Sequence, residues 1–127
     1  MTYFVSLHEK LRAMETDPST VGDPIKRMFI CDGQYLTASL VIVRDSGNAL
    51  HIHRAHDEIV FVLEGEANFR VGNGVRRAGP GDLLFIPRNS LHGPILREGD
   101  KFVALSVYAP FFDRSKKNIE WAKDKPP

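Results

Sequence analysis

Two histidines and a glutamate lie close together near the middle of the chain. One residue separates His51 from His53, so in a strand, where side chains alternate between faces, both imidazoles point the same way. Glu58 follows after a short turn, and a hairpin can fold its carboxylate back onto the imidazoles. Nitrogen and oxygen ligands without a thiolate suit manganese, iron(II), nickel, copper or zinc. These three side chains therefore predict a site for one divalent metal ion.

Two further side chains are candidates for proton transfer beside such a site. His56 lies between His53 and Glu58, where it could replace Glu58 as a ligand, act as an acid or base at the mouth, or remain solvated. Tyr108 is a plausible proton carrier. We therefore predict His56 and Tyr108 as catalytic residues.

A short helix is expected to precede the strands. Ser6 is followed three residues later by Glu9, the arrangement that opens a helix with reciprocal hydrogen bonds, so a helix is expected over 7–14. Asp17 precedes a proline, and the helix should end there.

The rest of the chain has the pattern of an all-β domain, with short runs of β-branched and aromatic residues between Gly, Asn, Asp and Pro. Its 127 residues have room for one domain with one core. Strands are expected near 26–31, 35–44, 49–53, 58–63, 67–71, 83–86 and 102–108. Turns are expected at 32–33, 45–48, 64–66, 72–74, 79–82 and 98–100.

Strand 58–63 is apolar on both faces, with Val60 and Val62 on one side and Ile59 and Phe61 on the other. In so small a domain the second face needs a partner, so a homodimer is expected. The aromatic residues are expected first in the core and second as a substrate wall: Phe61, Phe69, Phe85, Phe102 and Tyr108. Residues 115–127 are mostly polar and predict a mobile tail that Trp121 could pin down.

Composition excludes several classes of function. The net charge of +1 supplies no basic field for a phosphate backbone, so nucleic acid is not an expected partner. No stretch approaches the roughly 20 apolar residues that a membrane span needs. The single cysteine agrees with a reducing compartment, and a cytoplasmic location is expected.

Two motifs resemble those of the cupin superfamily, of the small single-domain, conserved-barrel type. The first is Gly47-x3-His51-x-His53-x4-Glu58-x6-Gly65, and the second is Gly81-x5-Pro87-x-Asn89-x2-His92. The first glycine is four positions before His51 where cupins usually have six, and Asn89 replaces a glycine. Asparagine also tolerates left-handed backbone, and neither departure touches a ligand.

The resemblance implies a double-stranded β-helix, the jelly-roll cupin barrel, over 35–110. It leaves the N-terminal helix and a connecting strand in 1–34 and a C-terminal tail in 111–127. It also implies that His92 joins His51, His53 and Glu58 as metal ligands, with one divalent ion per chain (Fe, Mn, Ni, Zn or Cu). Three histidines and a carboxylate leave two open positions on an octahedral ion.

Two hypotheses of function follow from the resemblance. The first is a metal-dependent enzyme acting on a small oxygen-bearing molecule, dioxygenase-like or, with the same ligands, an isomerase or decarboxylase. The second is a non-catalytic module that binds or senses a small molecule. Several polar residues could face the cavity and orient a substrate: Arg44, Asn68, Arg70, Asn89, Ser106 and Tyr108.

Overall fold

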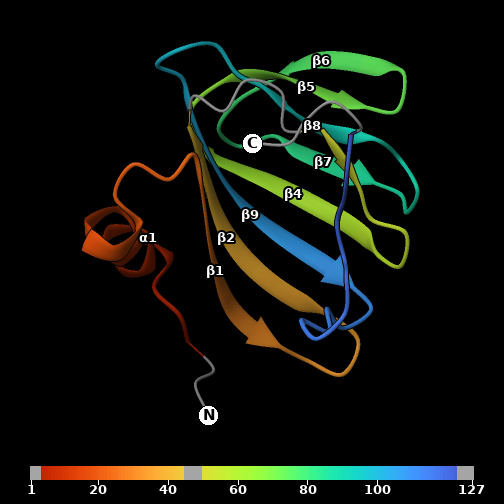
Figure 1. The fold of residues 1–127 in the computed structure, drawn as a ribbon, viewed down its shortest axis with the longest axis horizontal. Coiled ribbons are helices and arrows are strands. Elements are labelled where there is room, and N and C mark those ends of the chain that lie inside the picture. The colour runs from red at the N-terminus through yellow and green to blue at the C-terminus, as the bar shows by residue number, and fades with distance from the viewer. Residues whose placement is uncertain (1–3, 45–49, 123–127) are drawn as a thin grey trace.

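The chain folds into two antiparallel five-stranded sheets. The computed structural model describes residues 4–44 and 50–122. The first sheet has the order β1 (Ile25–Asp32), β2 (Thr37–Arg44), β9 (Lys101–Ala109), β4 (Asp57–Glu64) and β7 (Leu83–Ile86). The second has the order β10 (Glu120–Trp121), β3 (His51–Ile52), β8 (His92–Ile95), β5 (Ala67–Val71) and β6 (Gly74–Ala78). Figure 1 shows strands that are distant in sequence lying side by side, so the sheets can gather residues from both motifs.

The helix α1 (Leu7–Thr16) packs on the outer face of the first sheet. Its opening is the predicted one, because the Ser6 side chain accepts a hydrogen bond of 3.2 Å from the Glu9 amide. It runs two residues beyond the expected 7–14 and ends at Asp17, which caps the 3₁₀ turn η1 (Pro18–Thr20). Leu11 and Met14 bury themselves against a group of sheet residues: Leu40, Ile42 and Val103. In the parts of the chain that the structure describes, no helix is long and apolar enough to cross a membrane.

The main core fills the space between the sheets. Its buried members come from both sheets and include Val41, Val43, Val60, Val62, Phe69, Phe102 and Ala104. The expectation that aromatic residues belong to the core is confirmed for Phe69, Phe102 and Tyr108. It is wrong for Phe61 and Phe85, which are 37% and 58% exposed because they lie on the outer face of β4 and β7.

The predicted strands largely match the observed ones. Strands 67–71 and 83–86 have the expected bounds, and the others differ by one or two residues at an end. The expected turn at 45–48 and the start of strand 49–53 lie outside the described residues. Three strands were not expected: β6, β8 and β10. β8 contains Gly93 and Pro94, which are poor strand formers, and β6 carries two exposed arginines.

The tight turn between β4 and β5 depends on a glycine. Gly65 has φ +81°, and a Cβ there would collide with the carbonyl oxygen of Lys101 on β9. Only glycine meets both conditions without strain. This turn carries the chain from the first sheet to the second and so helps to set the two motifs opposite each other.

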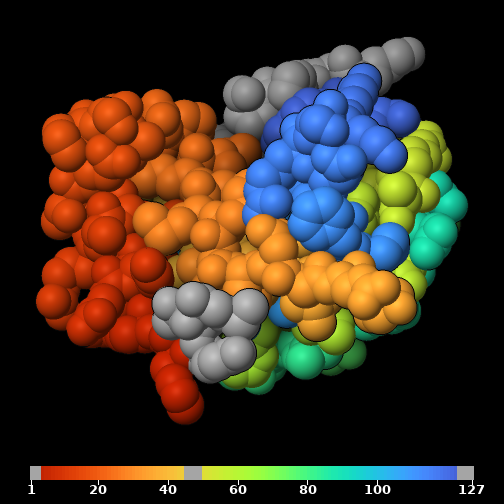
Figure 2. All heavy atoms as spheres, turned by 90° about the horizontal axis from the view of Figure 1, so that it is seen from below, coloured from red at the N-terminus to blue at the C-terminus, as the bar shows by residue number. Residues whose placement is uncertain are grey.

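The described C-terminal segment, 110–122, is packed against the barrel, so the expectation of a mobile tail over 115–127 is wrong for residues 115–122, which contact the barrel through Asn118 and β10. Phe112 is buried, its ring centroid lies 4.5 Å from that of Tyr108, and its amide donates to Thr37 Oγ1. Arg114 pairs with Asp32 at 3.1 Å. Figure 2 shows this segment, in blue, lying against the orange residues of β1 and the following turn, and in Figure 1 it runs back toward β8. It ends in β10, which pairs with β3.

Candidate metal centre

Three histidines from two places in the chain gather between the sheets. His51 in β3 is the strand partner of His92, the first residue of β8, and His53 follows β3 directly. Each offers a ring nitrogen, and the three nitrogens lie within 4.8 Å of one another. His53 and His92 are 2% and 1% exposed. This cluster could hold a metal ion, and the grouping of His51, His53 and His92 agrees with the sequence prediction.

Glu58 reaches the cluster from β4 in the opposite sheet. Its Oε1 lies 3.1 Å from His92 Nε2 and 3.4 Å from His53 Nε2. Burial raises the pKa of the Glu58 carboxyl, but the close approach of His53 and His92 lowers the pKa more, to well below its usual range. The group is therefore an ionised carboxylate beside three imidazoles. That Glu58 binds the metal ion as a fourth ligand stays a prediction.

Backbone carbonyl groups fix the orientation of two of the imidazoles. His53 Nδ1 lies 2.8 Å from the carbonyl oxygen of Asn118, and His92 Nδ1 lies 2.9 Å from that of Ser90. A carbonyl oxygen only accepts, so each Nδ1 carries a proton and each ring turns its Nε2 inward. Both Nε2 atoms then face the Glu58 carboxylate, and His92 Nε2 lies within hydrogen-bonding distance of its Oε1.

The donor set fits a cation because two ring nitrogens and a carboxylate oxygen that point at one another need a proton or a metal ion between them. His53 Nε2 is buried and makes no hydrogen bond in the structure, although the Glu58 carboxylate is near. A buried nitrogen without a partner is costly unless something binds it. Imidazoles that donate Nδ1–H to a carbonyl and present Nε2 inward are the common arrangement around protein metal ions. The residues present thus suit a divalent transition metal.

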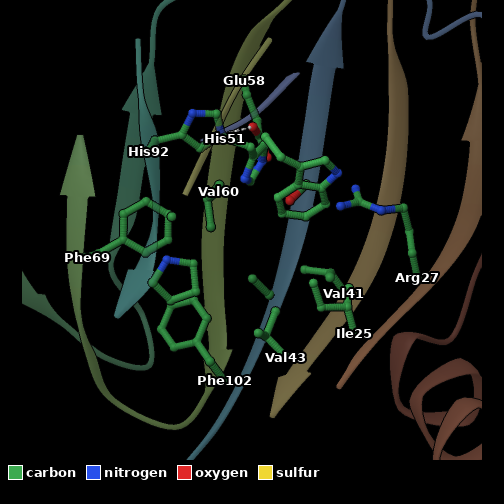
Figure 3. A pocket seen from close by; sticks show the side chains of 15 residues that line it. Ile25, Arg27, Val41, Val43, His51, Glu58, Val60, Phe69, His92 and Phe102 are labelled. Atoms are coloured by element: carbon green, nitrogen blue, oxygen red, sulfur yellow. Dashed lines mark hydrogen bonds and ion pairs between the residues drawn. The ribbon is translucent and has the colours of Figure 1, made fainter. Parts of the chain in front are cut away.

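A cavity of about 50 Å³ opens beside the cluster. His51, Glu58 and His92 lie at one end, and Figure 3 shows them above apolar side chains from both sheets. The apolar part of the lining includes Val41, Val43, Val60, Phe69, Phe102 and Trp121. This volume has room for roughly three to five water molecules. A small ligand could therefore sit within reach of the histidines in a largely apolar space.

Sequence reasoning gave no role to Asn118 and only an optional one to Trp121. The Trp121 ring centroid lies 5.2 Å from that of His51, and Trp121 lines the cavity. Pairing of Trp121 with His51 in neighbouring strands puts the indole there. The signal in the sequence was an aromatic residue in an otherwise polar segment, and the alternative that Trp121 pins the segment down is confirmed.

The two predicted catalytic residues are buried next to each other. His56 is 4% exposed, its Nε2 lies 3.1 Å from the Phe111 carbonyl oxygen, and its Nδ1 has no hydrogen-bond partner among the described residues. The interpretation of His56 as solvated is therefore wrong. Burial raises the pKa of Tyr108 to about 12, and the Glu58 charge adds to that, so the phenol holds its proton near neutral pH. Neither is among the lining residues of the cavity, and their catalytic role stays a prediction.

Most of the polar residues expected near the cavity lie elsewhere. Arg44 pairs with Glu15 of α1, Arg70 donates to the Gly72 carbonyl, and Asn68 is exposed. Asn89 has φ +72°, which bears out its left-handed turn, and Ser106 does line the cavity.

A polar residue that was not expected, Arg27, also lines the cavity. It lies within the predicted strand 26–31 and shares a strand face with Ile25, another lining residue. That alternation was the signal that could have found it.

Comparison with known proteins agrees with this architecture. In sequence, the chain is 28% identical over 110 residues to quercetin 2,3-dioxygenase of Bacillus subtilis (strain 168). The aligned region covers 80% of this chain. The chain spans about a third of that relative's length, 33%.

Solved structures show the same fold. KdgF from a Halomonas species superposes with a TM-score of 0.70 at 25% identity, covering 91% of this chain and 100% of that one. A Klebsiella pneumoniae protein with a double-stranded β-helix domain gives 0.72 at 20% identity, covering 98% and 100%. The expected all-β double-stranded β-helix with a short N-terminal helix is confirmed. The family model described as the cupin domain, Cupin_2, matches residues 41–108, more than half of the chain, and the chain therefore belongs to the Cupin_2 family.

Proposed function

We propose that this cupin is a metal-dependent enzyme that acts on a small oxygen-bearing molecule, with dioxygenase-like chemistry as the first candidate. The observation that carries the proposal is the convergence of three imidazole nitrogens within 4.8 Å at the end of an apolar cavity. The similarity to a dioxygenase, over a third of that enzyme's length, supports the choice of reaction class. Isomerase or decarboxylase chemistry would use the same residues.

His51, His53, His92 and Glu58 would hold the metal in this proposal. When bound, a divalent metal polarises a ligand oxygen as a Lewis acid and, if it is iron, supports reaction with dioxygen. The carbonyl groups of Asn118 and Ser90 keep the two buried imidazoles turned toward the ion, and the ionised Glu58 offsets part of its charge. Fixing the ligands before the ion arrives lowers the cost of ordering them.

The remaining residues of the site control water and protons. Phe69, Phe102 and Trp121 make the cavity apolar, which strengthens electrostatic interactions inside it. Tyr108 keeps its proton near neutral pH because its pKa is raised to about 12, so it can donate a hydrogen bond but not act as a base. A cavity of about 50 Å³ favours a substrate much smaller than drug-sized ligands, whose pockets run to roughly 300–1,000 Å³.

A non-catalytic role in binding or sensing a small molecule is the second candidate. The specific observation in its favour is the position of Trp121, whose ring centroid lies 5.2 Å from that of His51 and which lines the cavity. An aromatic wall beside the histidines suits retention of a small ligand as well as it suits turnover. The same metal ligands would then fix the ligand without reaction.

Oxygen consumption separates the two candidates. The iron(II)-loaded protein, prepared without oxygen, is mixed with aerated buffer and one member of a panel of small catechols, β-diketones, thiols and keto acids. The proposal expects substrate-dependent oxygen uptake that is lost in His53→Ala and kept in His8→Ala, a matched change on exposed α1. No uptake across the panel, together with a ligand that raises the melting temperature, would support the binding role and overturn the dioxygenase proposal.

A further inference from the structure

Arg27 occupies the boundary between the inner cavity and the protein surface. It lines the cavity that contains His51, Glu58 and His92, and it also lines a second, outer groove formed with the C-terminal segment. Figure 3 shows the Arg27 side chain reaching into the cavity from the side opposite Phe69. Arg27 is the residue that the two sets of lining residues share.

The guanidinium has hydrogen-bonding capacity to spare. Its Nη1 donates to the Tyr108 hydroxyl and, at 3.4 Å, to Ser39 Oγ. In the described parts of the chain, Nη2 and Nε have no acceptor, and no carboxylate pairs with Arg27. A half-buried guanidinium beside apolar walls is stabilised by an anion that accepts from two of its nitrogens. Tyr108 and Ser39 therefore hold Arg27 in place and leave its outer edge for a ligand.

The charges around the cavity also favour an anionic ligand. Three neutral imidazoles and one carboxylate around a divalent ion leave a net positive charge, and Arg27 adds another. Glu58 is the only carboxylate among the described residues that line the cavity. A neutral ligand would leave these positive charges unbalanced in an apolar space, whereas a singly charged anion offsets one of them.

The outer groove is basic as well. Its lining includes Arg27, Arg114, Lys116 and Lys117, and no acidic side chain among the described residues lines it. Arg114 is neutralised by Asp32 at 3.1 Å, and Lys116 lies 3.9 Å from Asp113. Lys117 has no ion pair within the part of the chain that the structure describes. Arg27 and Lys117 thus remain to attract an anion toward the cavity.

We infer that the ligand of this site is a short-chain organic acid whose carboxylate binds Arg27 while a second oxygen, from a hydroxyl or oxo group, faces the histidines. The inference rests on the proposed function for that second contact and for the positive charge of the bound ion. The cavity volume of about 50 Å³ sets the size at that of a 2-hydroxy or 2-oxo acid. One arginine with a planar fork suits a singly charged carboxylate, whereas phosphate sites gather several cationic groups.

The test compares lactate with lactamide, which has the same shape without the charge. Dissociation constants are measured by nuclear magnetic resonance titration of the full chain, both free of metal and loaded with zinc, following the indole N–H of Trp121. Lactate is expected to bind at least about tenfold more tightly than lactamide in both forms. Equal binding of the two in wild-type protein would overturn the inference, as would inorganic phosphate binding as tightly as lactate.

Variants then assign the effect to one side chain. Arg27→Gln is expected to remove the preference for lactate, and Arg27→Lys to keep part of it. Arg76→Gln, the same loss of charge on exposed β6, should leave the preference intact. A preference that survives in a folded Arg27→Gln protein would overturn the assignment. If the protein binds no zinc but still prefers lactate in an Arg27-dependent way, the proposed function is contradicted and this inference is supported. If the protein has metal-dependent activity but no preference for lactate, this inference is contradicted and the proposed function is supported.

Discussion

His53 Nδ1 lies 2.8 Å from the carbonyl oxygen of Asn118, a residue 65 positions further along the chain. This hydrogen bond joins a predicted metal ligand to the segment that runs back from β9 across the barrel. It holds the proton on Nδ1 and turns Nε2 toward Glu58 and His92. The C-terminal segment is therefore part of the metal centre rather than an appendage to it.

Removal of that contact should weaken metal binding. A chain ending at Lys117 lacks Asn118 and Trp121, and its zinc affinity is expected to fall by about 10–100-fold, the usual effect of losing a group that orients a ligand. A chain ending at Ala122 keeps both residues and serves as the control. Zinc affinity is measured by competition with a chelator, with circular dichroism to verify folding. Equal affinities in the two folded chains would contradict the role given to Asn118.

Trp121 provides a direct optical report on the centre, because it is the only tryptophan in the sequence. Its ring lies 5.2 Å from that of His51, so copper(II) bound there should quench most of the indole fluorescence. Zinc, which has a filled d shell, should change the emission far less and should block later quenching by copper. Quenching that is equally strong in a folded His51→Ala/His53→Ala protein would show that copper binds elsewhere.

The sequence predicted the elements that carry local signals. Ser6 and Glu9 predict the start of the helix, and the apolar residues of 58–63 predict β4. The spacing of His51 and His53 predicts that their side chains lie on a common face. These features depend on neighbours in the chain. The resemblance to cupins added His92, which no local pattern connects with His51.

Features that depend on distant contacts escaped prediction. β8 forms in spite of Gly93 and Pro94 because β3 and β5 flank it and supply partners. The C-terminal segment is polar, yet backbone pairing with β3 and the burial of Phe112 hold it. Phe85 has a core-like side chain but stands on an outer face that α1 does not reach. Tertiary context overrides composition in each case.

The outer face of β4 and β7 is the predicted site of homodimer formation. Ile59 pairs with Phe85 and Phe61 with Leu83, and these four side chains are 37–60% exposed. A contiguous apolar group of this kind favours burial against a second copy. Sedimentation should give a dimer for the wild type and a monomer for Phe85→Glu, while Val75→Glu on exposed β6 should remain a dimer. A wild-type protein that sediments as a 14.3 kDa monomer at tens of micromolar would refute the dimer.

Docking of α1 should depend weakly on pH. Glu15 receives hydrogen bonds from Lys101 at 2.6 Å and Arg44 at 2.9 Å, and the bond from Lys101 is the main cause of its lowered pKa. A lowered carboxyl pKa adds stability above the ordinary value of 4.5 and loses it as pH falls through the lower, folded-state value.

Glu15→Gln should therefore reduce the free energy of unfolding at pH 7 by up to about 1 kcal/mol, since the group is partly exposed, and by less at pH 3. Glu98→Gln, at an exposed carboxyl that makes no ion pair within the described ranges 4–44 and 50–122, is the control for urea titrations at both pH values. A loss of stability in Glu15→Gln that does not shrink at pH 3 would contradict this account.

The most direct measurement of the central claim is the metal content of the purified protein. Elemental analysis after loading with iron(II) or zinc and removal of the excess should give close to one ion per chain for the wild type and for His8→Ala. The double variant His51→Ala/His53→Ala, with circular dichroism to verify folding, should retain almost none. Equal metal content in the double variant and the wild type would contradict a metal centre at these histidines.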